Sequence, residues 1–315
     1  MKATFTAHFD LMYRSSRDPA LALCTDVYVP RRPAPLLLHV HGWHGSRVHG
    51  RKIAELFAPH FVVVNVDMRG RGKSEGRPDV NGWELLDAVD ALHFARRAFS
   101  RHISDPERIY CVGASGGGGN VFALVGKFPD LFTAGVALCG ISDYAAWYRG
   151  DQVGEFRDDM DAWLGASPDE APALYRSASG LYLVENLVTP LLVYHGDADL
   201  RVPVEMSRRY AARARQLGKP VTYIELPGEG HALDYPALAP QITEFLLSHT
   251  RPPRLGRRGR LAVGGYVQTR RDRLELPSLA HFAVVSYGLD PEGRLIEVQP
   301  ETEYQRVALT HVQLC

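Results

Sequence analysis

One serine stands among small residues in "GASGG", Gly113 to Gly117, which fits the pattern G-x-S-x-G. At such a turn the serine hydroxyl projects from the end of a strand, and only small neighbours avoid clashes with the adjacent strand and helix. The preceding "RIYCVG" is apolar and strand-like, and the following "NVFALVGKF" has an apolar face at helical spacing. Ser115 is therefore a candidate nucleophile at a strand-to-helix turn.

A serine hydroxyl is a weak nucleophile near neutral pH, so it needs a general base and a carboxylate that orients the base. The loop "GEGH" offers His231 as the base, and "HGDADLRVP" offers Asp197 and Asp199 as carboxylates. Each stretch follows a strand-like run, and loops at the carboxyl ends of parallel strands meet at one edge of the sheet. The three groups needed for acyl transfer are thus predicted to converge.

The stretch "HVHGWHG" also follows a strand-like run and predicts a loop beside the serine turn. Acyl transfer needs donors for the developing oxyanion, and we expect the backbone N–H groups of Gly116 and Trp43 to supply them. His41 and His44 lie in the same stretch, but no third ligand accompanies them, so no metal site is predicted. Neither a metal nor an organic cofactor is expected.

The stretch "DMRGRGKSEG", Asp67 to Gly76, is rich in glycine but lacks the phosphate-binding frame GxxxxGK[ST]. We interpret it as a tight loop after a strand, with Asp67 and Arg69 holding it in place.

Short apolar runs alternate with helical segments along most of the chain, which predicts a parallel sheet covered on both faces. The runs are apolar throughout, as strands buried on both faces require. They are "APLLLHVHG", "HFVVVNVD", "RIYCVG", "FTAGVALCG", "TPLLVYHG" and "VTYIELPG". Before them, "TFTAHFDLMYR" and "LALCTDVYVP" predict an antiparallel hairpin at the edge of the sheet. The fold class is therefore α/β with right-handed crossovers.

The alternation breaks in an aromatic-rich insertion, residues 141–188, which lies between two strands where a lid over the site could form. Tyr144, Trp147, Tyr148 and Trp163 are candidate substrate-lining residues. The alternative, that these aromatic side chains only pack two surface helices together, stays open.

The composition changes after residue 250, so we predict a catalytic domain over residues 1–250 and a C-terminal β-rich extension over residues 251–315. "RPPRLGRRGR" reads as a linker, and the runs that follow it read as short strands joined by turns. The arginines of this region are interpreted as solvated linker and strand faces. Its strands could also pair edge to edge with a second copy of the chain, which would make a homo-oligomer.

The whole chain has 315 residues, 45% of them hydrophobic and 23% charged, with a formal net charge of zero. This is the composition of a globular protein, and it gives no electrostatic case for nucleic acid or a membrane surface as a partner. No apolar run of membrane-spanning length or signal peptide is apparent, so a cytoplasmic location is expected. The scattered Cys24, Cys111, Cys139 and Cys315 predict reduced thiols, mostly buried.

Residues from about 20 to 248 resemble the α/β-hydrolase superfamily, and within it the catalytic domain of the prolyl oligopeptidase (S9) group and its related esterases. The resemblance lies in "DPERIYCVGASGGG", "DMRGRGKSEG", "TPLLVYHGDADLRVP" and "PGEGHAL". It implies the α/β-hydrolase fold, with a mostly parallel central sheet flanked by helices. It also implies Ser115 as nucleophile and His231 as base. The acid of that group follows HGxxD, which falls on Asp199 and leaves Asp197 as a turn-capping residue.

Two departures from the S9 pattern bear on the substrate. The residue after the serine is usually bulky in that group, whereas this chain has Gly116, and the peptidases carry an N-terminal propeller for which no segment is apparent here. We therefore expect a carboxylesterase-like serine hydrolase acting on a small-molecule ester. An S9-like peptidase or amidase acting on a short peptide is the alternative, and a non-catalytic binding scaffold is the third.

Overall fold

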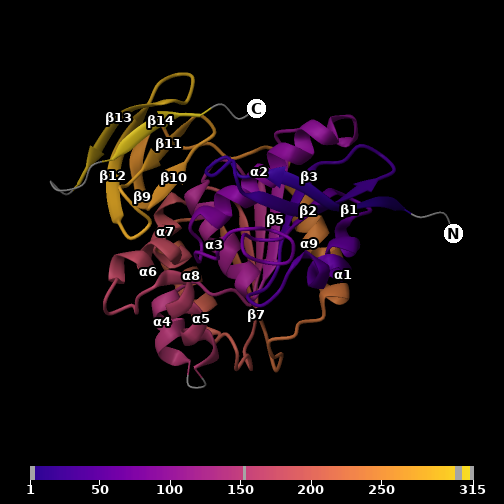
Figure 1. Cartoon of the computed structure of the whole chain (residues 1–315), viewed down its shortest axis with the longest axis horizontal. Helices are drawn as coiled ribbons and strands as arrows, with labels where there is room; N and C mark the ends of the chain where they lie inside the picture. The colour runs from indigo at the N-terminus through magenta and orange to yellow at the C-terminus, as the bar shows by residue number, and fades with distance from the viewer. Residues whose placement is uncertain (1–3, 152–153, 302–306, 313–315) are drawn as a thin grey trace.

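The computed structural model describes residues 4–151, 154–301 and 307–312. Its larger sheet has the strand order β1-β2-β4-β3-β5-β6-β7-β8 (Figure 1). The strands are β1 (Phe5–Arg14), β2 (Ala22–Pro30), β3 (Leu36–Val40), β4 (Val62–Val66), β5 (Ile109–Ala114), β6 (Ala134–Leu138), β7 (Leu191–Gly196) and β8 (Val221–Leu226).

The pairing of these strands confirms the predicted α/β class. The β1–β2 hairpin is antiparallel and lies at the sheet edge, and β2 pairs antiparallel with β4. All the remaining pairs, from β4 to β8, are parallel. Every residue of β3, β4 and β6 is buried, which explains why these strands are apolar along both faces.

Helices cover both faces of the larger sheet. Alternate residues of a strand point to opposite faces, so Leu37 packs with α1 (Arg47–Phe57) and α9 (Tyr235–Ser248). Leu36 and Leu38 pack instead with α2 (Trp83–Ala98), α3 (Gly116–Lys127) and α8 (Glu205–Gln216). Among the described residues, no helix is both long enough and apolar enough to cross a bilayer. Cys24, Cys111 and Cys139 are buried free thiols, as predicted, whereas Cys315 lies outside the described residues.

The segment between β6 and β7 consists of short helices rather than one long element. They are α4 (Tyr144–Gly150), α5 (Glu155–Leu164), α6 (Pro172–Ala178) and α7 (Gly180–Leu183), followed by the 3₁₀ turn η2 (Val184–Asn186). Aromatic and apolar side chains of α4, α5 and α6 form an apolar cluster of their own with Val80, Val202 and Met206. This cluster holds the insertion over the end of the sheet that carries Ser115.

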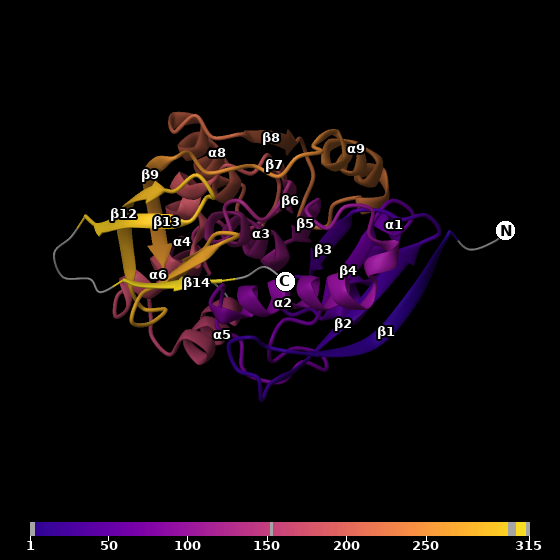
Figure 2. The same ribbon diagram turned by 90° about the horizontal axis from the view of Figure 1, so that it is seen from above.

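A second sheet follows α9, with strand order β13-β12-β9-β10-β11-β14 and antiparallel pairing throughout. Its strands are β9 (Arg258–Gly264), β10 (Tyr266–Gln268), β11 (Asp272–Glu275), β12 (Phe282–Leu289), β13 (Leu295–Pro300) and β14 (Ala308–His311). Figures 1 and 2 both show this sheet beside α3 and α6, on the far side of the molecule from β1. The C-terminal region is thus β-rich, as the composition predicts.

Buried contacts fasten the second sheet to the helices. The Tyr266 ring stacks on Trp83 with 4.8 Å between ring centroids. The amide side chain of Asn186 donates to the carbonyl of Ala262 and accepts from its N–H, each at 2.7 Å. Lys127 Nζ donates to the carbonyl of Gly264 at 2.6 Å. The second sheet is therefore packed against α2, α3 and η2.

The contact of Lys127 predicts a pH-dependent stability. Burial lowers the pKa of Lys127 from its ordinary value of 10.5 to about 7. Between these two values the unfolded chain binds a proton that the folded chain does not, so the free energy of unfolding should rise with pH. We expect urea unfolding to show this rise from pH 7 to 9, and Lys127→Met to flatten it. The same pH dependence in wild type and Lys127→Met would contradict the assignment of this rise to Lys127.

Candidate active site

Ser115 lies on a strained turn between β5 and α3. Its φ of 59° and ψ of −123° are costly for a residue with a side chain, and they persist only where the surroundings impose them. The surroundings here are backbone: a Cβ on Gly113 would meet the Gly117 carbonyl, and a Cβ on Gly117 would meet the Val40 carbonyl of β3. Gly113 is needed because the backbone at Gly117 folds back over it, and Gly117 is needed because it lies directly against the backbone of β3.

Three loops at the carboxyl end of the sheet bring a serine, a histidine and an aspartate into one hydrogen-bonded chain. His231 Nε2 lies 2.9 Å from Ser115 Oγ, and His231 Nδ1 lies 2.7 Å from Asp199 Oδ2. A proton on Nδ1 donated to the carboxylate leaves Nε2 to accept from the serine hydroxyl. Asp197 is elsewhere, because its carboxylate accepts from the N–H of Gly228 at 2.7 Å.

Asp199 is buried yet held as an anion. Burial alone would raise the pKa of Asp199, but hydrogen bonds from His195, His231 and the Val202 N–H outweigh burial and bring this pKa well below its usual range. Asp199 Oδ1 accepts from the N–H groups of Arg201 and Val202, each at 2.9 Å. A permanently charged carboxylate at this place can stabilise a protonated His231.

His195 supports this arrangement, and sequence reasoning treated it only as the first letter of HGxxD. Its Nε2 lies 3.4 Å from Asp199 Oδ2 and 2.8 Å from the Val202 carbonyl, and its Nδ1 lies 2.7 Å from Ser207 Oγ. Cys139 joins His195 and Asp199 in a group whose potential ligand atoms lie within 4.8 Å of one another. Burial raises the pKa of Cys139 to about 12, so this side chain is a neutral thiol beside His195 and Asp199.

The backbone of Trp43 lies against the residue that follows the serine. A Cβ on Gly116 would lie 2.5 Å from Trp43 N, and a Cβ on Gly42 would lie 4.0 Å from Ser115 Oγ. The loop after β3 therefore leaves no room for a side chain at Gly116. Ser115 and His231 share a cavity of about 370 Å³ with Gly42, Trp43 and other residues of this loop.

The two histidines of this loop, His41 and His44, have different hydrogen-bond partners. His41 is buried, with Nε2 accepting from the Met68 N–H at 3.2 Å and Nδ1 lying 2.8 Å from the Gly42 carbonyl. His44 instead pairs with Asp159, at 2.6 Å.

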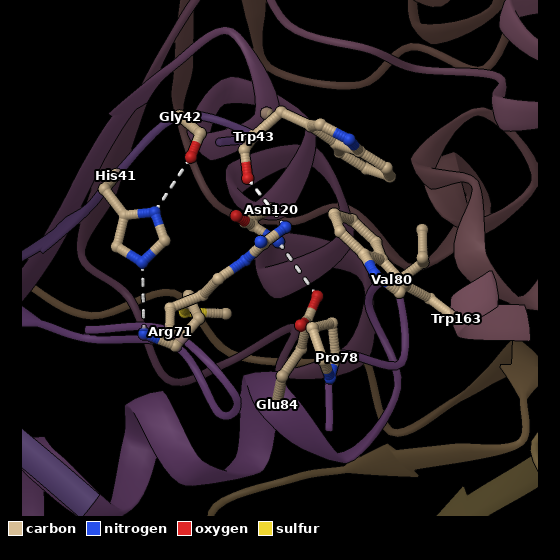
Figure 3. Close-up of a pocket in the computed structure, with 11 residues that line it drawn as sticks. His41, Gly42, Trp43, Arg71, Pro78, Val80, Glu84, Asn120 and Trp163 are labelled. Atoms are coloured by element: carbon tan, nitrogen blue, oxygen red, sulfur yellow. Dashed lines mark hydrogen bonds between the residues drawn. The ribbon is translucent and has the colours of Figure 1, made fainter. Parts of the chain in front are cut away.

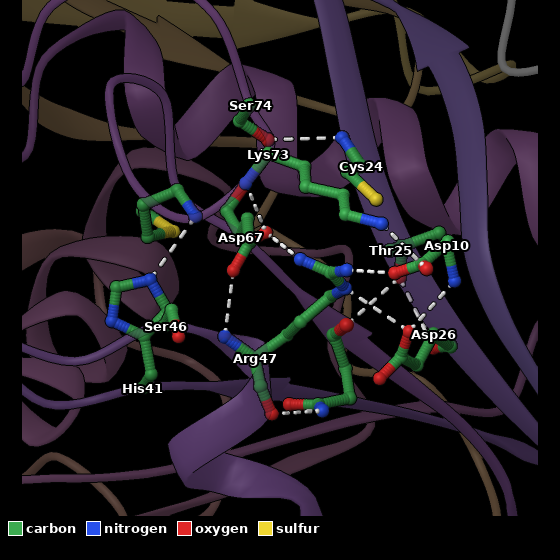
Figure 4. Close-up of polar contacts among 12 residues, drawn as sticks. Asp10, Cys24, Thr25, Asp26, His41, Ser46, Arg47, Asp67, Lys73 and Ser74 are labelled. Atoms are coloured by element: carbon green, nitrogen blue, oxygen red, sulfur yellow. Dashed lines mark hydrogen bonds and ion pairs between the residues drawn. The ribbon is translucent and has the colours of Figure 1, made fainter.

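An ion network beneath the loop holds it in place (Figure 4). Arg47, the first residue of α1, is buried and pairs with Asp10, Asp26 and Asp67. Asp67 also accepts from the N–H of Arg47 at 2.7 Å and from the N–H of Lys73 at 2.9 Å. The same residue thus ties the glycine-rich loop 67–76 to the start of α1, which follows Trp43 by four residues. This confirms the interpretation of that stretch as a tight loop.

The aromatic candidates of the insertion do not gather around Ser115. Trp43 packs on three of them, with ring centroids 5.8 Å from Tyr144, 5.0 Å from Trp147 and 4.6 Å from Trp163. Trp163 lines a small pocket beside Gly116 and Trp43.

The other three candidates lie outside that pocket. Tyr144 is buried within the insertion cluster, and Trp147 lines a separate cavity next to Asp199. The ring of Tyr148 packs on Tyr175. Of the four, the structure brings Trp163 to the pocket beside Gly116.

Fold and site together define an α/β-hydrolase. Residues 48–250 match the model of the prolyl oligopeptidase family, so the chain belongs to this S9 family of hydrolases. It is similar to esterase LipC of Mycobacterium tuberculosis, with 30% identity over 69% of this chain and 58% of the relative. It is also similar to dipeptidyl peptidase family member 6 of Caenorhabditis elegans, with 27% identity over 66% of this chain and 30% of the relative.

Solved structures share the fold. Acylaminoacyl peptidase of Pyrococcus horikoshii aligns with a TM-score of 0.67 and 22% identity, over 81% of this chain and 43% of that one. The Pyrococcus furiosus esterase Pf2001 aligns with a TM-score of 0.61 and 18% identity, over 78% of this chain and 93% of that one. The chain spans less than two thirds of the length of the curated relatives named above.

The close approach of Gly116 to Trp43 N predicts that even a methyl group at position 116 will slow the reaction. Gly116→Ala should push the Trp43 backbone away from Ser115. If the Trp43 N–H is an oxyanion donor, as we expect, kcat should fall by about 10²–10³ with little change in KM. Gly150→Ala is the matched control, because nothing lies within 4 Å of its Cβ position. Steady-state kinetics give kcat for both variants, and equal kcat values would contradict a role of the Gly116–Trp43 contact in the reaction.

We expect the buried Arg47 to contribute far more to the free energy of unfolding than an exposed cation does. Arg47→Met leaves buried carboxylates without their cation, so we expect the free energy of unfolding to fall by about 3–5 kcal/mol. Lys73→Met removes an exposed partner of Asp10 and should cost about 0–1 kcal/mol. Urea denaturation measures both, and similar values for the two variants would disprove the proposed network.

Proposed function

We propose that this protein is a serine hydrolase that transfers an acyl group to water through an acyl-enzyme intermediate. The observation that carries the proposal is the hydrogen-bonded chain from Ser115 Oγ through His231 to Asp199 on a strained strand-to-helix turn. A serine, a base and an orienting carboxylate in this order are the parts that such a reaction requires.

In the first half of the reaction, Ser115 Oγ attacks the substrate carbonyl carbon while His231 Nε2 takes the hydroxyl proton. The carbonyl oxygen becomes an oxyanion, for which we propose the N–H groups of Gly116 and Trp43 as donors. His231 then gives its proton to the leaving group, and the bond to the leaving group breaks. The charge of Asp199 stabilises the protonated imidazole throughout.

In the second half, His231 takes a proton from water and the resulting hydroxide attacks the acyl carbon. The tetrahedral intermediate collapses, the bond to Ser115 Oγ breaks, and the serine recovers its proton from His231. The products are a carboxylic acid and a free serine.

For the substrate we infer a carboxylic ester of a small molecule. Support comes from the similarity to an esterase over 69% of the chain. A peptide or amide is the second candidate, supported by the match to the prolyl oligopeptidase family and by peptidase relatives.

A matched panel separates the two substrates: p-nitrophenyl esters of rising acyl length beside peptidyl p-nitroanilides, with kcat/KM measured for each. Ester turnover with a chain-length optimum and no anilide turnover is the result we expect. Anilide turnover at comparable efficiency would instead support the peptidase function. No turnover of either kind, with Ser115 unreactive toward a fluorophosphonate, would point to a binding scaffold.

Substitutions of the three side chains test the assignment of roles. Ser115→Ala should reduce kcat by about 10⁶, because the nucleophile is lost. Asp199→Asn should reduce it by about 10⁴, because the amide cannot hold His231 in the required tautomer. Asp197→Asn is the control and should leave kcat near wild type, since Asp197 only caps a turn. A larger loss in Asp197→Asn than in Asp199→Asn would overturn the choice of acid.

A further inference from the structure

A small pocket lined by both polar and apolar side chains adjoins the proposed oxyanion donors (Figure 3). It shares His41, Gly42 and Trp43 with the cavity around Ser115, and Gly116 also lines it. Its cavity volume is about 30 Å³, which leaves room for about two water molecules or a polar group of similar size. Besides His41, its polar side chains come from three separate segments: Arg71 from the loop after β4, Glu84 from α2 and Asn120 from α3.

The orientation of Asn120 follows from its neighbours. Asn81 Nδ2 donates to the carbonyl of Ala178 at 2.7 Å, which turns Asn81 Oδ1 toward Asn120. Asn120 Nδ2 then donates to Asn81 Oδ1 at 2.7 Å, so the remaining atom of this amide is an acceptor. Within the described part of the chain, Asn120 Oδ1 accepts no hydrogen bond, although 92% of the residue's surface is buried (8% remains exposed).

Glu84 leaves a second acceptor open. Its Oε1 accepts from the N–H of Asn81 at 2.7 Å, whereas its Oε2 has no hydrogen-bond donor among the residues that the structure describes. Burial and the nearby Asp79 raise the pKa of Glu84 to about 7, so both protonation states exist near neutral pH.

Arg71 supplies the donors. Its Nη2 donates to the Trp43 carbonyl at 2.9 Å, and its guanidinium lies 4.1 Å from the centroid of the Trp163 ring. These contacts fix the group in place. Its Nε and Nη1 donate to no residue in the described ranges, so they are available to a ligand.

We propose that this pocket is a specificity subsite that binds an uncharged carboxamide on a short acyl group of the substrate. Arg71 donates to the amide oxygen, and Glu84 and Asn120 accept from the amide N–H groups. Above pH 7, where Glu84 is mostly ionised, a carboxylate of the same shape would meet Arg71 but also face two acceptors, so the substrates are compared at pH 8. A hydrocarbon would leave the free Arg71 N–H groups, Glu84 Oε2 and Asn120 Oδ1 unpaired. The proposal rests on the acyl-transfer function proposed above and adds the substrate class.

Three methyl esters of one shape test the proposal: methyl succinamate, monomethyl succinate and methyl 4-methylpentanoate. They end in a carboxamide, a carboxylate and an isopropyl group. For the wild-type protein we expect kcat/KM for methyl succinamate to exceed that for the isopropyl ester by about tenfold or more, because a polar site rejects a ligand that leaves it unpaired. Preference for the isopropyl ester or for monomethyl succinate would overturn the proposal.

Substitutions test whether Arg71 and Glu84 recognise the carboxamide group. Arg71→Met should bring the succinamate-to-isopropyl ratio to about one, whereas a merely structural role of Arg71 would lower both rates and leave the ratio unchanged. Glu84→Gln replaces an acceptor by a donor and should shift preference toward monomethyl succinate. Arg77→Met, an exposed arginine of the same loop, is the control and should keep the wild-type ratio. An unchanged ratio in Arg71→Met would disprove the subsite.

A binding measurement on an inactive variant tests the subsite independently of the reaction. Ligand-observed NMR on Ser115→Ala should show methyl succinamate binding about tenfold more tightly than the isopropyl ester, and Ser115→Ala/Arg71→Met should abolish the difference. If wild type hydrolyses no ester but this binding difference is present, the proposed function fails and the subsite stands. Equal binding of the two esters would refute the subsite whatever the reaction.

Discussion

The contact between the serine turn and strand β3 is the constraint on which the rest of this active site depends. Gly117 has no room for a side chain because the β3 backbone lies against it, and Gly113 has none because the Gly117 carbonyl and the Val40 side chain lie against it. Between them Ser115 has an unfavourable φ of 59°. The same contact places Gly116 against Trp43 N. Ser115 and the proposed oxyanion donors are therefore positioned by one region of backbone packing.

Charges that lie away from the reacting atoms maintain this geometry. On one side, backbone N–H groups and His195 keep Asp199 ionised behind His231. On the other side, Arg47 gathers carboxylates from β1, β2 and the loop after β4 at the start of α1. Because such pairs are buried, each depends on its partners more than a surface ion pair does. The loops of the site are thereby held by residues of short motifs, such as Asp67 and Asp199, together with Arg47, which belongs to none.

Much of the fold and the core of the site could be predicted from the sequence. Uniformly apolar runs identify strands covered on both faces, and Ser115, Asp199 and His231 each follow such a run, which is why their convergence could be foreseen. The pocket of Arg71, Glu84 and Asn120 could not, because its members come from separate segments with no common motif. Likewise, the contact of Lys127 with Gly264 joins residues 137 positions apart, and only tertiary packing decides it. The boundary at residue 250 stays a prediction.

The most direct test of Ser115 as an activated nucleophile is the mass of the protein, and of its peptides, after reaction with a fluorophosphonate. This reagent captures a serine only where a base activates the hydroxyl and the site stabilises the resulting charge. We expect one adduct per chain, located on Ser115, formed rapidly by wild type and far more slowly by Asp199→Asn. An unmodified Ser115, or an adduct on another residue, would contradict it.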